Sequence, residues 1–301
     1  MNQASSTQVK STPKLSQSWS EWIRNGLAEL READKLTLLA IGIMAFFILA
    51  ALFPSLFSTF DPNELHPQDA LSSPSFTYIL GTDDLGRDIW SRIIHGSRIA
   101  IFIAVSAMVL ASAIGVPLGL IAGMRKGIVD GIIMRMLDAI LAFPVILFAI
   151  LLVAAFEASI ATIILVMAIV YIPRFARLVR GNVLVLSERE FVIASKALGA
   201  TDQRIMWRTM LPNTLATVLV QASIGMAFTI LLEAALSYLG LGVQPPTATW
   251  GTMLRNAQRY AFLAPWYVVS PGVCIFLIVL VFNFLGDRLR DRLDPKLRGS
   301  R

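Results

Sequence analysis

Residues 99–123 read IAIFIAVSAMVLASAIGVPLGLIAG, and this stretch decides the fold. It contains no charged residue, and the first charges after it are Arg125 and Lys126. About 20 consecutive apolar residues in a helix cross the roughly 30 Å of hydrocarbon in a bilayer. Only a helix or a closed barrel satisfies its own backbone hydrogen bonds in lipid. The stretch therefore predicts a membrane-spanning helix.

The whole composition agrees with a membrane protein. The chain has 301 residues, of which 56% are hydrophobic and only 15% are charged, and its mean hydropathy is +0.68. Soluble domains carry about 25% charged residues. The net charge of +6 is explained by basic residues in cytosolic loops, so we expect membrane lipid and no nucleic acid as a partner.

Five more apolar runs have a similar character, so the sequence predicts an all-α membrane protein with six transmembrane helices. The expected spans are residues 36–57, 99–123, 131–156, 160–172, 214–239 and 266–285. The fourth helix is expected to continue through Arg174, Arg177 and Arg180 into the cytosol.

The remaining segments divide the chain around these spans. Residues 1–35 are expected to form a cytosolic tail with an amphipathic helix from Trp19, which lies on the membrane surface or packs against the protein. We expect a periplasmic loop at 58–98, a core at 99–290 that holds the other five spans and a loop at 181–213, and a cytosolic tail at 291–301.

The distribution of basic residues predicts the orientation. With both termini cytoplasmic, 21 of the 26 Lys and Arg residues lie on the cytosolic side. The five on the other side are Arg87, Arg92, Arg98, Arg255 and Arg259. Positive residues favour the cytosolic side of inner-membrane proteins, so this asymmetry places the 181–213 loop in the cytosol.

Small residues and prolines occur within the expected spans. Ala111, Gly115, Gly119 and Gly123 recur every four residues, which leaves one edge of that helix nearly bare and lets another helix approach closely. We expect Pro117 and Pro144 to kink their spans.

The expected cytosolic loop carries a recognisable motif. Residues 187–201 read SEREFVIASKALGAT, and residues 210–213 read MLPN. This resembles the EAA loop of ABC importer permeases, which has Glu-Ala-Ala, three residues, Gly, nine residues, Ile, one residue and Leu-Pro. Ile193 stands where that motif has Glu, and Thr209 stands where it has Ile.

The residues themselves fit this resemblance. One side of a helix would carry Phe191, Ala194, Ser195 and Leu198, a short apolar surface with two small residues. Gly199 is expected to end that helix as a C′ glycine, and Pro212 to stop the helix before the fifth span. The alternative is a helix lying on the membrane or packed on its own bundle.

The resemblance implies a coupling helix between the fourth and fifth spans that docks on an ATPase subunit. The residues carried over to that role are Glu190, Phe191, Ala194, Ser195, Lys196, Leu198, Gly199, Leu211 and Pro212.

Three further stretches resemble dipeptide and oligopeptide ABC permeases, specifically the second of their two membrane subunits. They are LGTDDLGRDIWSR at 80–92, EAALSYLGLGVQPPT at 233–247 followed by WGTML at 250–254, and FNFLGDRLRDRLDPK at 282–296. The likeness runs from about residue 35 to 298. It implies a multi-pass permease of the bacterial inner membrane that moves di- and oligopeptides, or alternatively nickel, glutathione or opines.

The same resemblance implies the partners. They are a second homologous permease subunit, two ATP-binding subunits and a periplasmic peptide-binding protein. The sequence contains no Gly-x-x-x-x-Gly-Lys-Ser/Thr phosphate loop, so we expect no enzyme activity and no cofactor here, with ATP and Mg bound by the partner subunits.

Other functional classes fit the residues less well. Cys274 is the single cysteine, and His66 and His95 lie far apart, so no metal site is expected. An ion-driven secondary transporter would need paired charges inside the membrane, but the first, second and sixth spans lack acidic residues.

The outer loops and two polar span residues are further candidates. Contacts with the binding protein are expected from Asp83, Asp84, Arg87, Asp88, Trp250 and Arg255, unless these residues brace the outer face of the bundle. Gln221 and Glu233 are candidates for the translocation path. Each has a structural alternative, a hydrogen bond between or within helices.

Overall fold

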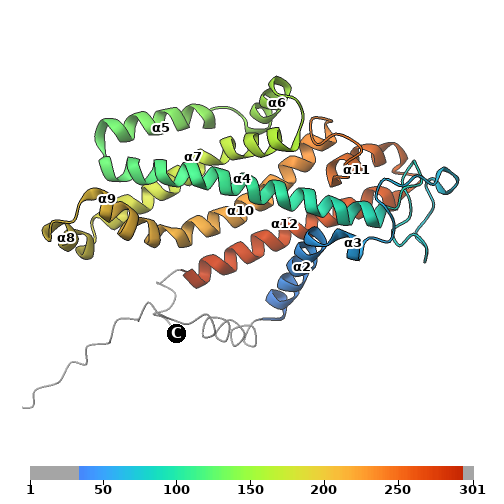
Figure 1. Cartoon of the computed structure of the whole chain (residues 1–301), viewed down its shortest axis with the longest axis horizontal. Coiled ribbons are helices and arrows are strands. Elements are labelled where there is room, and N and C mark those ends of the chain that lie inside the picture. Colours follow the sequence, from blue (N-terminus) through green and yellow to red (C-terminus); the bar gives the residue numbers. More distant parts are fainter. Residues whose placement is uncertain (1–33, 294–301) are drawn as a thin grey trace, which may run out of the picture. The chain divides into compact units, whose positions relative to one another are not determined.

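The computed structural model describes residues 34–293, and the regular structure in that range is helical (Figure 1). Within that range, residues 34–39 and 40–293 belong to two separate units. The amphipathic helix expected from Trp19 lies outside the described residues.

Within residues 34–293, five helices are long and apolar enough to span a membrane. Four of them are α2 (Lys35–Leu52), α4 (Ile89–Arg125), α7 (Ile160–Ser187) and α12 (Pro265–Leu293). The fifth runs over Asp202–Tyr238 and ends in α10 (Leu211–Tyr238). The predicted all-α membrane fold is confirmed.

The third expected span is broken. Residues 131–156 were expected as one helix, but the structure has α5 (Gly127–Leu141) and α6 (Val145–Ala155), bent by 86°. Pro144 is the N-cap of α6. Proline lacks an N–H and disfavours helical backbone at the residue before it, so the break falls where the sequence places proline. The bundle has six spans if this bent pair is one of them.

Shorter helices connect the long ones. They are α3 (Pro54–Phe57), η1 (Pro67–Asp69), α8 (Glu190–Ala197), α9 (Asp202–Ile205), the π-turn η2 (Met206–Met210), α11 (Trp250–Ala257) and η3 (Gln258–Tyr260). Helix α4 begins at Ile89, so its first turns belong to the segment 58–98 that is expected as the outer loop. Asp88 starts the helix because its side chain accepts a hydrogen bond from the Ser91 N–H.

Helices α4 and α7 pack along the row of small residues. A Cβ built on Gly115 would lie 2.8 Å from the Cβ of Phe175, and one on Gly123 would lie 2.7 Å from the Cβ of Val183. These distances leave room only for hydrogen, so the bare edge predicted for α4 is the surface on which α7 lies. Pro117 is accommodated inside the continuous helix α4.

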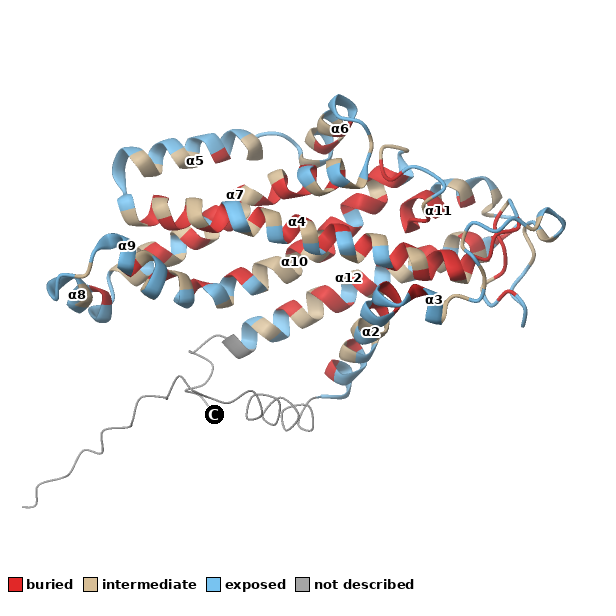
Figure 2. Ribbon diagram, in the orientation of Figure 1, coloured by how far each residue is buried: buried red, intermediate tan, exposed pale blue. Residues whose placement is uncertain are grey.

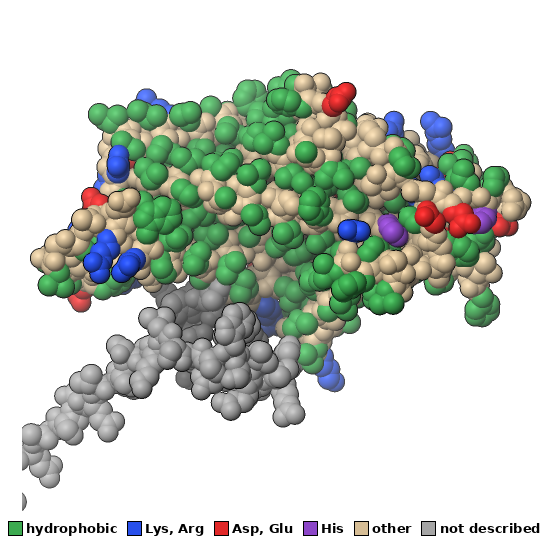
Figure 3. Space-filling model, viewed as in Figure 1, with side chains coloured by type: hydrophobic (Ala, Val, Ile, Leu, Met, Phe, Trp, Pro, Cys, Tyr) green, Lys and Arg blue, Asp and Glu red, His purple; other side chains and the backbone are tan. Residues whose placement is uncertain are grey.

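Two hydrophobic clusters fill the bundle. Figure 2 shows the buried residues along the helices that form it. One surrounds Tyr171 and Phe175 of α7, and the other surrounds Trp250 of α11 and Tyr267 of α12. In the face shown in Figure 3, hydrophobic side chains cover the middle, while Lys and Arg gather near α8 and α9 and acidic residues gather at the opposite end. This distribution suits a protein with a lipid-facing belt and two polar ends.

Candidate functional site

The α7–α10 connection presents an apolar surface away from the bundle. Leu198 is 89% exposed, and Phe191, Ile193 and Ala194 are also exposed. On the other side of α8, Val192 is fully buried in the cluster that also holds Ile205. Thus α8 is anchored by one buried side chain and leaves Phe191, Ile193 and Ala194 exposed.

Gly199 ends α8 in a Schellman motif. Its φ is +81°, its N–H donates to the Lys196 carbonyl at 2.9 Å, and the Ala200 N–H donates to the Ser195 carbonyl at 3.1 Å. Glycine adopts this left-handed backbone without strain, so it sets the direction in which the chain leaves α8. Leu198, the C-cap residue, is thereby held at the tip of the turn.

The remaining predicted coupling residues lie around this tip. Glu190 is in the first turn of α8 and Lys196 in the last, which suits the helix dipole. Ser195 donates through its hydroxyl to the Phe191 carbonyl at 2.7 Å. Leu211 is partly buried against the core and Pro212 is exposed, both at the start of α10.

The expectation that Pro212 stops the helix is wrong. Helical structure continues from Asp202 to Tyr238 through the π-turn η2, in which the Leu211 N–H donates to the Met206 carbonyl. In an α-helix the proline ring would clash with the carbonyl four residues earlier. The wider π-turn relieves that clash, so α9 and α10 form one continuous helical unit.

The outer loop is built on a buried ion pair. Asp83 is fully buried, and its Oδ2 accepts a hydrogen bond from Arg87 Nε at 2.6 Å. Its Oδ1 accepts from the backbone N–H groups of Leu85 and Arg87, each at 2.9 Å. The guanidinium of Arg92 lies 3.7 Å away and is also buried. One carboxylate therefore balances two buried cations.

Replacing Asp83 with asparagine is expected to destabilise the chain by about 3–5 kcal/mol, because it leaves buried cations uncompensated. The amide keeps the shape and can still accept from the backbone, so charge is the main change. A fall of about 10 °C in the detergent melting temperature is expected. Asp84→Asn, on the partly exposed neighbour, is the control and should shift melting by about 2 °C. Equal melting temperatures for the two variants would contradict the prediction.

The other predicted outer-face residues divide into buried and accessible ones. Asp88 accepts from Ser91 Oγ at 2.6 Å and from Thr59 Oγ1 at 2.9 Å, and the buried Trp250 indole donates to the Ile93 carbonyl at 3.1 Å. The side chains of Asp88 and Trp250 are therefore buried beneath the outer surface, as are those of Asp83 and Arg87.

Asp84 and Arg255 reach the surface. They share a small pocket of about 180 Å³ with Arg259 and Tyr260. Asp84 also accepts a hydrogen bond from the Tyr267 hydroxyl at 3.1 Å. Of the six predicted contact residues, these two are brought together where another protein could touch both.

The two predicted path residues lie in different surroundings. Glu233 is 2% exposed and accepts a hydrogen bond from Ser237 Oγ at 2.7 Å, one turn along α10. Gln221 is partly buried on α10. Four residues before it, Thr217 accepts a hydrogen bond from the Asn182 side chain of α7 at 2.6 Å.

Two ion pairs connect helix α5 to α7. Asp130 accepts from Arg180 Nε at 2.5 Å and from Nη2 at 2.6 Å, and Asp138 pairs with Arg177. These contacts give two of the three arginines on α7 a carboxylate partner. Asp138 is thus a bracing group in this structure.

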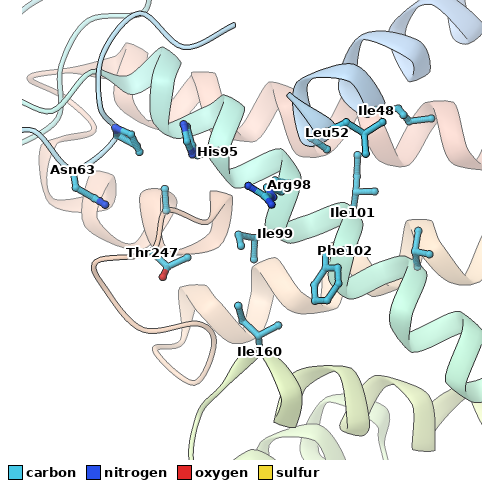
Figure 4. Close-up of a pocket in the computed structure, with 14 residues that line it drawn as sticks. Ile48, Leu52, Asn63, His95, Arg98, Ile99, Ile101, Phe102, Ile160 and Thr247 are labelled. Atoms are coloured by element: carbon cyan, nitrogen blue, oxygen red, sulfur yellow. The ribbon is translucent and has the colours of Figure 1, made fainter. Parts of the chain in front are cut away.

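A cavity with a volume of about 760 Å³ lies beside α4 (Figure 4). Arg98 and His95 line it together with apolar side chains that include Ile48, Phe102 and Ile160. None of the site residues predicted from the sequence is among its lining residues.

Three features missed by the sequence reasoning matter here. Val192 anchors α8, the π-turn joins α9 to α10, and Arg174 lies over two aromatic rings. The apolar run 191–193 gave a signal for Val192 because three consecutive apolar residues cannot all face one way on a helix. The other two features depend on contacts between residues far apart in the chain or on local helix geometry.

These features define a multi-pass membrane protein with an exposed apolar helical surface at one end. The family model for "Binding-protein-dependent transport system inner membrane component" matches residues 115–299. The dipeptide transport system permease protein DppC of Alkalihalophilus pseudofirmus is 43% identical over 93% of this chain and 91% of its own length. The glutathione transport system permease protein GsiD of Pectobacterium atrosepticum is 40% identical over 93% of this chain and 90% of its own.

The fold is also found in a solved structure of the MetNI methionine ABC transporter, described as inward-facing. It matches with a TM-score of 0.56 and 16% identity, covering 68% of this chain and 97% of that one. The chain belongs to the family of binding-protein-dependent transport system inner membrane components. It is a permease component of an ABC transport system of the bacterial inner membrane, and such a component works with ATPase partners and is not itself the ATPase. The resemblance drawn from the sequence motifs is confirmed.

Proposed function

We propose that this chain is one of two homologous membrane subunits of an importer that carries dipeptides and oligopeptides inward. Two ATP-binding subunits hydrolyse ATP on the cytosolic side, and a periplasmic peptide-binding protein delivers the cargo. The observation that carries this proposal is the 89% exposure of Leu198 on a helix that Val192 anchors to the bundle. The 43% identical dipeptide permease supports the choice of peptides as cargo.

The docking surface consists of Phe191, Ala194, Ser195, Leu198 and the turn at Gly199. An apolar tip with two small residues beside it fits a groove on another protein, and its burial there would release ordered water. Leu198 contributes most because it is the most exposed of these side chains. Glu190 and Lys196 would flank the contact as polar rim residues.

The path from docking surface to membrane is a continuous helical unit. Leu211 and Pro212 lie where the π-turn passes into α10, so a displacement of α8 and α9 is carried along α10. Helix α10 packs on α4, α7 and α12, the helices that form most of the bundle. Through such a link, closure of the ATPases can shift the equilibrium between two arrangements of the helices.

The outer end would receive the binding protein. Asp84 and Arg255 are its direct contacts in this proposal, while Asp83, Arg87, Asp88 and Trp250 hold the surrounding loops in shape. Both termini and the α7–α10 connection lie in the cytosol, as the distribution of basic residues favours. Gln221 lies on the translocation path, and Glu233 braces α10 through Ser237.

Glutathione is the second candidate cargo. A glutathione permease protein is 40% identical to this chain over nearly the same length as the dipeptide relative. Glutathione is itself a tripeptide with free carboxylates, so the two cargo classes share their chemistry. The binding protein would then select between them.

The proposal is tested by reconstituting the chain with its paired permease and ATP-binding subunits in proteoliposomes. Binding protein loaded with a radiolabelled dipeptide, an oligopeptide or glutathione is added on the outer side. We expect uptake of peptide that requires ATP and the binding protein. Uptake driven by an ion gradient without ATP would overturn the proposed function, and exclusive uptake of glutathione would replace the peptide cargo by the second candidate.

A further inference from the structure

Arg174 differs from the other arginines of α7 in its surroundings. It lies fourteen residues after Ile160 and thirteen before Ser187, which places it at the middle of the helix. Arg177 and Arg180 each have a carboxylate from α5. Among residues 34–293, Arg174 has no carboxylate partner, and its hydrogen bond is from Nη1 to the Tyr171 hydroxyl at 3.2 Å.

Two aromatic rings hold this guanidinium in place. Its Cζ lies 4.7 Å from the centroid of the Tyr171 ring and 5.3 Å from that of Phe228 on α10. The two rings contact each other edge to face at 6.2 Å. A cation over ring faces is stabilised without a counter-ion, and the edge of the guanidinium keeps its remaining N–H donors available.

The aromatic support is itself fixed by packing. Tyr171 is fully buried, and a Cβ on Gly225 of α10 would lie 3.0 Å from its ring. Glycine at that position therefore lets the Tyr171 ring lie against α10. This arrangement holds Arg174 at a defined place between two long helices, whereas a lipid-facing arginine would be free to reach for the headgroups.

The neighbouring face of α10 is polar. Gln221 lies seven residues before Phe228, and Thr217 lies four residues before Gln221, so the three share one face of the helix. Thr217 is exposed, and Gln221 and Phe228 are partly exposed. With Arg174, which lies two residues beyond the expected span at 160–172, they form a strip along the α7–α10 seam that offers hydrogen bonds and one positive charge without a carboxylate partner among residues 34–293.

We propose that Arg174 binds the terminal carboxylate of the peptide as it passes through the membrane, and that Gln221 receives the polar groups behind it. This inference rests on the proposed function. An arginine presents paired N–H donors that match a carboxylate with two parallel hydrogen bonds. Every unmodified peptide ends in a carboxylate, and glutathione carries carboxylates as well, so one cation serves both candidate cargoes.

Such a site would let the permease itself favour cargo with a free carboxylate, so the external binding protein would not have to supply that selectivity. A cation held between packed helices without a counter-ion is costly, and charged groups in or beside spans are commonly found on an ion or substrate pathway. A cargo without the carboxylate would leave this cation unpaired. Peptides with a free terminus are therefore expected to pass faster than their amides.

The test compares a dipeptide with its C-terminal amide in the complete reconstituted importer. Each is presented on binding protein loaded to saturation, so capture does not limit the rate. The variants are Arg174→Gln, Arg174→Lys and, as the matched control on the same helix, Arg177→Gln. Subunit composition and basal ATP hydrolysis are measured for every variant to verify assembly.

We expect Arg174→Gln to slow uptake of the free acid by about tenfold or more and to change uptake of the amide by about twofold or less. Arg174→Lys should recover part of the loss for the acid. Arg177→Gln should change the two rates by the same factor, because its partner is Asp138. If the wild type does not move the amide, loss of acid uptake in an assembled Arg174→Gln complex and its partial recovery with lysine support the proposal.

Equal proportional losses for acid and amide in Arg174→Gln would overturn the inference and point to an acidic residue of the paired subunit as the partner of Arg174. Unchanged acid uptake would also overturn it. Both results leave the proposed function in place, since peptide is still moved by the wild type. A wild-type importer that moves no peptide overturns both proposals.

Discussion

Replacing Leu198 with glutamate is expected to abolish transport while leaving the chain folded and inserted. Leu198 is 89% exposed, so the substitution costs the isolated chain little. In the assembled importer it removes an apolar contact of about 1.5–3 kcal/mol and places a charge in the groove that receives α8. Each 1.4 kcal/mol is about tenfold in affinity, so docking should weaken on the order of 100-fold or more.

The measurement is ATP hydrolysis stimulated by loaded binding protein, together with uptake and subunit composition. Leu198→Met is the matched control because methionine is apolar and has a similar volume, and this variant should retain most of the activity. Stimulated hydrolysis at the wild-type rate in Leu198→Glu would show that this surface does not contact the ATPase.

Replacing Gly119 with leucine is expected to prevent the chain from folding stably. A Cβ at this position would lie 2.9 Å from the Cβ of Val179 and would also meet the Ala176 backbone of α7. Neither atom can move without separating the two helices. Even Gly119→Ala is expected to cost about 1–3 kcal/mol, and leucine more, against a total stability of about 5–15 kcal/mol.

The matched control is the same change on the facing helix. A Cβ on Gly181 of α7 would meet nothing within 4 Å, so Gly181→Ala should be tolerated and gain about 0.5–1 kcal/mol of helix stability. Detergent melting and size-exclusion profiles of Gly119→Ala, Gly119→Leu and Gly181→Ala give the comparison. Similar melting temperatures for the two alanine variants would contradict close α4–α7 packing at Gly119.

The membrane fold could be predicted from the sequence because its signals are local. A charge-free run such as residues 99–123 can satisfy its backbone in lipid only as a helix. The four-residue spacing of Gly115, Gly119 and Gly123 also defines the packing edge of α4, since residues at this spacing share one face. No long-range information was needed for either conclusion.

How far each proline disturbs its helix could not be predicted, because this depends on neighbouring turns. The kink expected at Pro144 is confirmed, and it is a full break with a bend of 86° between α5 and α6. Pro212 was expected to stop a helix, yet the π-turn η2 lets the helix pass. In both cases proline marks the place, while the surrounding packing decides whether the helix breaks, bends or widens.

The candidate site could be predicted in part. The helix end at Gly199 follows from a short motif, because a glycine after a helical apolar pattern favours a left-handed C′ position. The burial of Asp83, Arg87 and Asp88 could not be inferred, since charged residues in loops are mostly exposed. Arg174 was missed because its aromatic partners come from two helices, one of which begins 37 residues later.

The central claim is that the α7–α10 connection faces the cytosol and is covered by the ATP-binding subunits. The direct test is thiol labelling of Leu198→Cys in a Cys274→Ala background, with a membrane-impermeant reagent. In inside-out vesicles, we expect rapid labelling when the ATP-binding subunits are absent and protection when they are bound, with no labelling of intact spheroplasts. Labelling from outside intact spheroplasts, or equal labelling with and without the ATP-binding subunits, would contradict the claim.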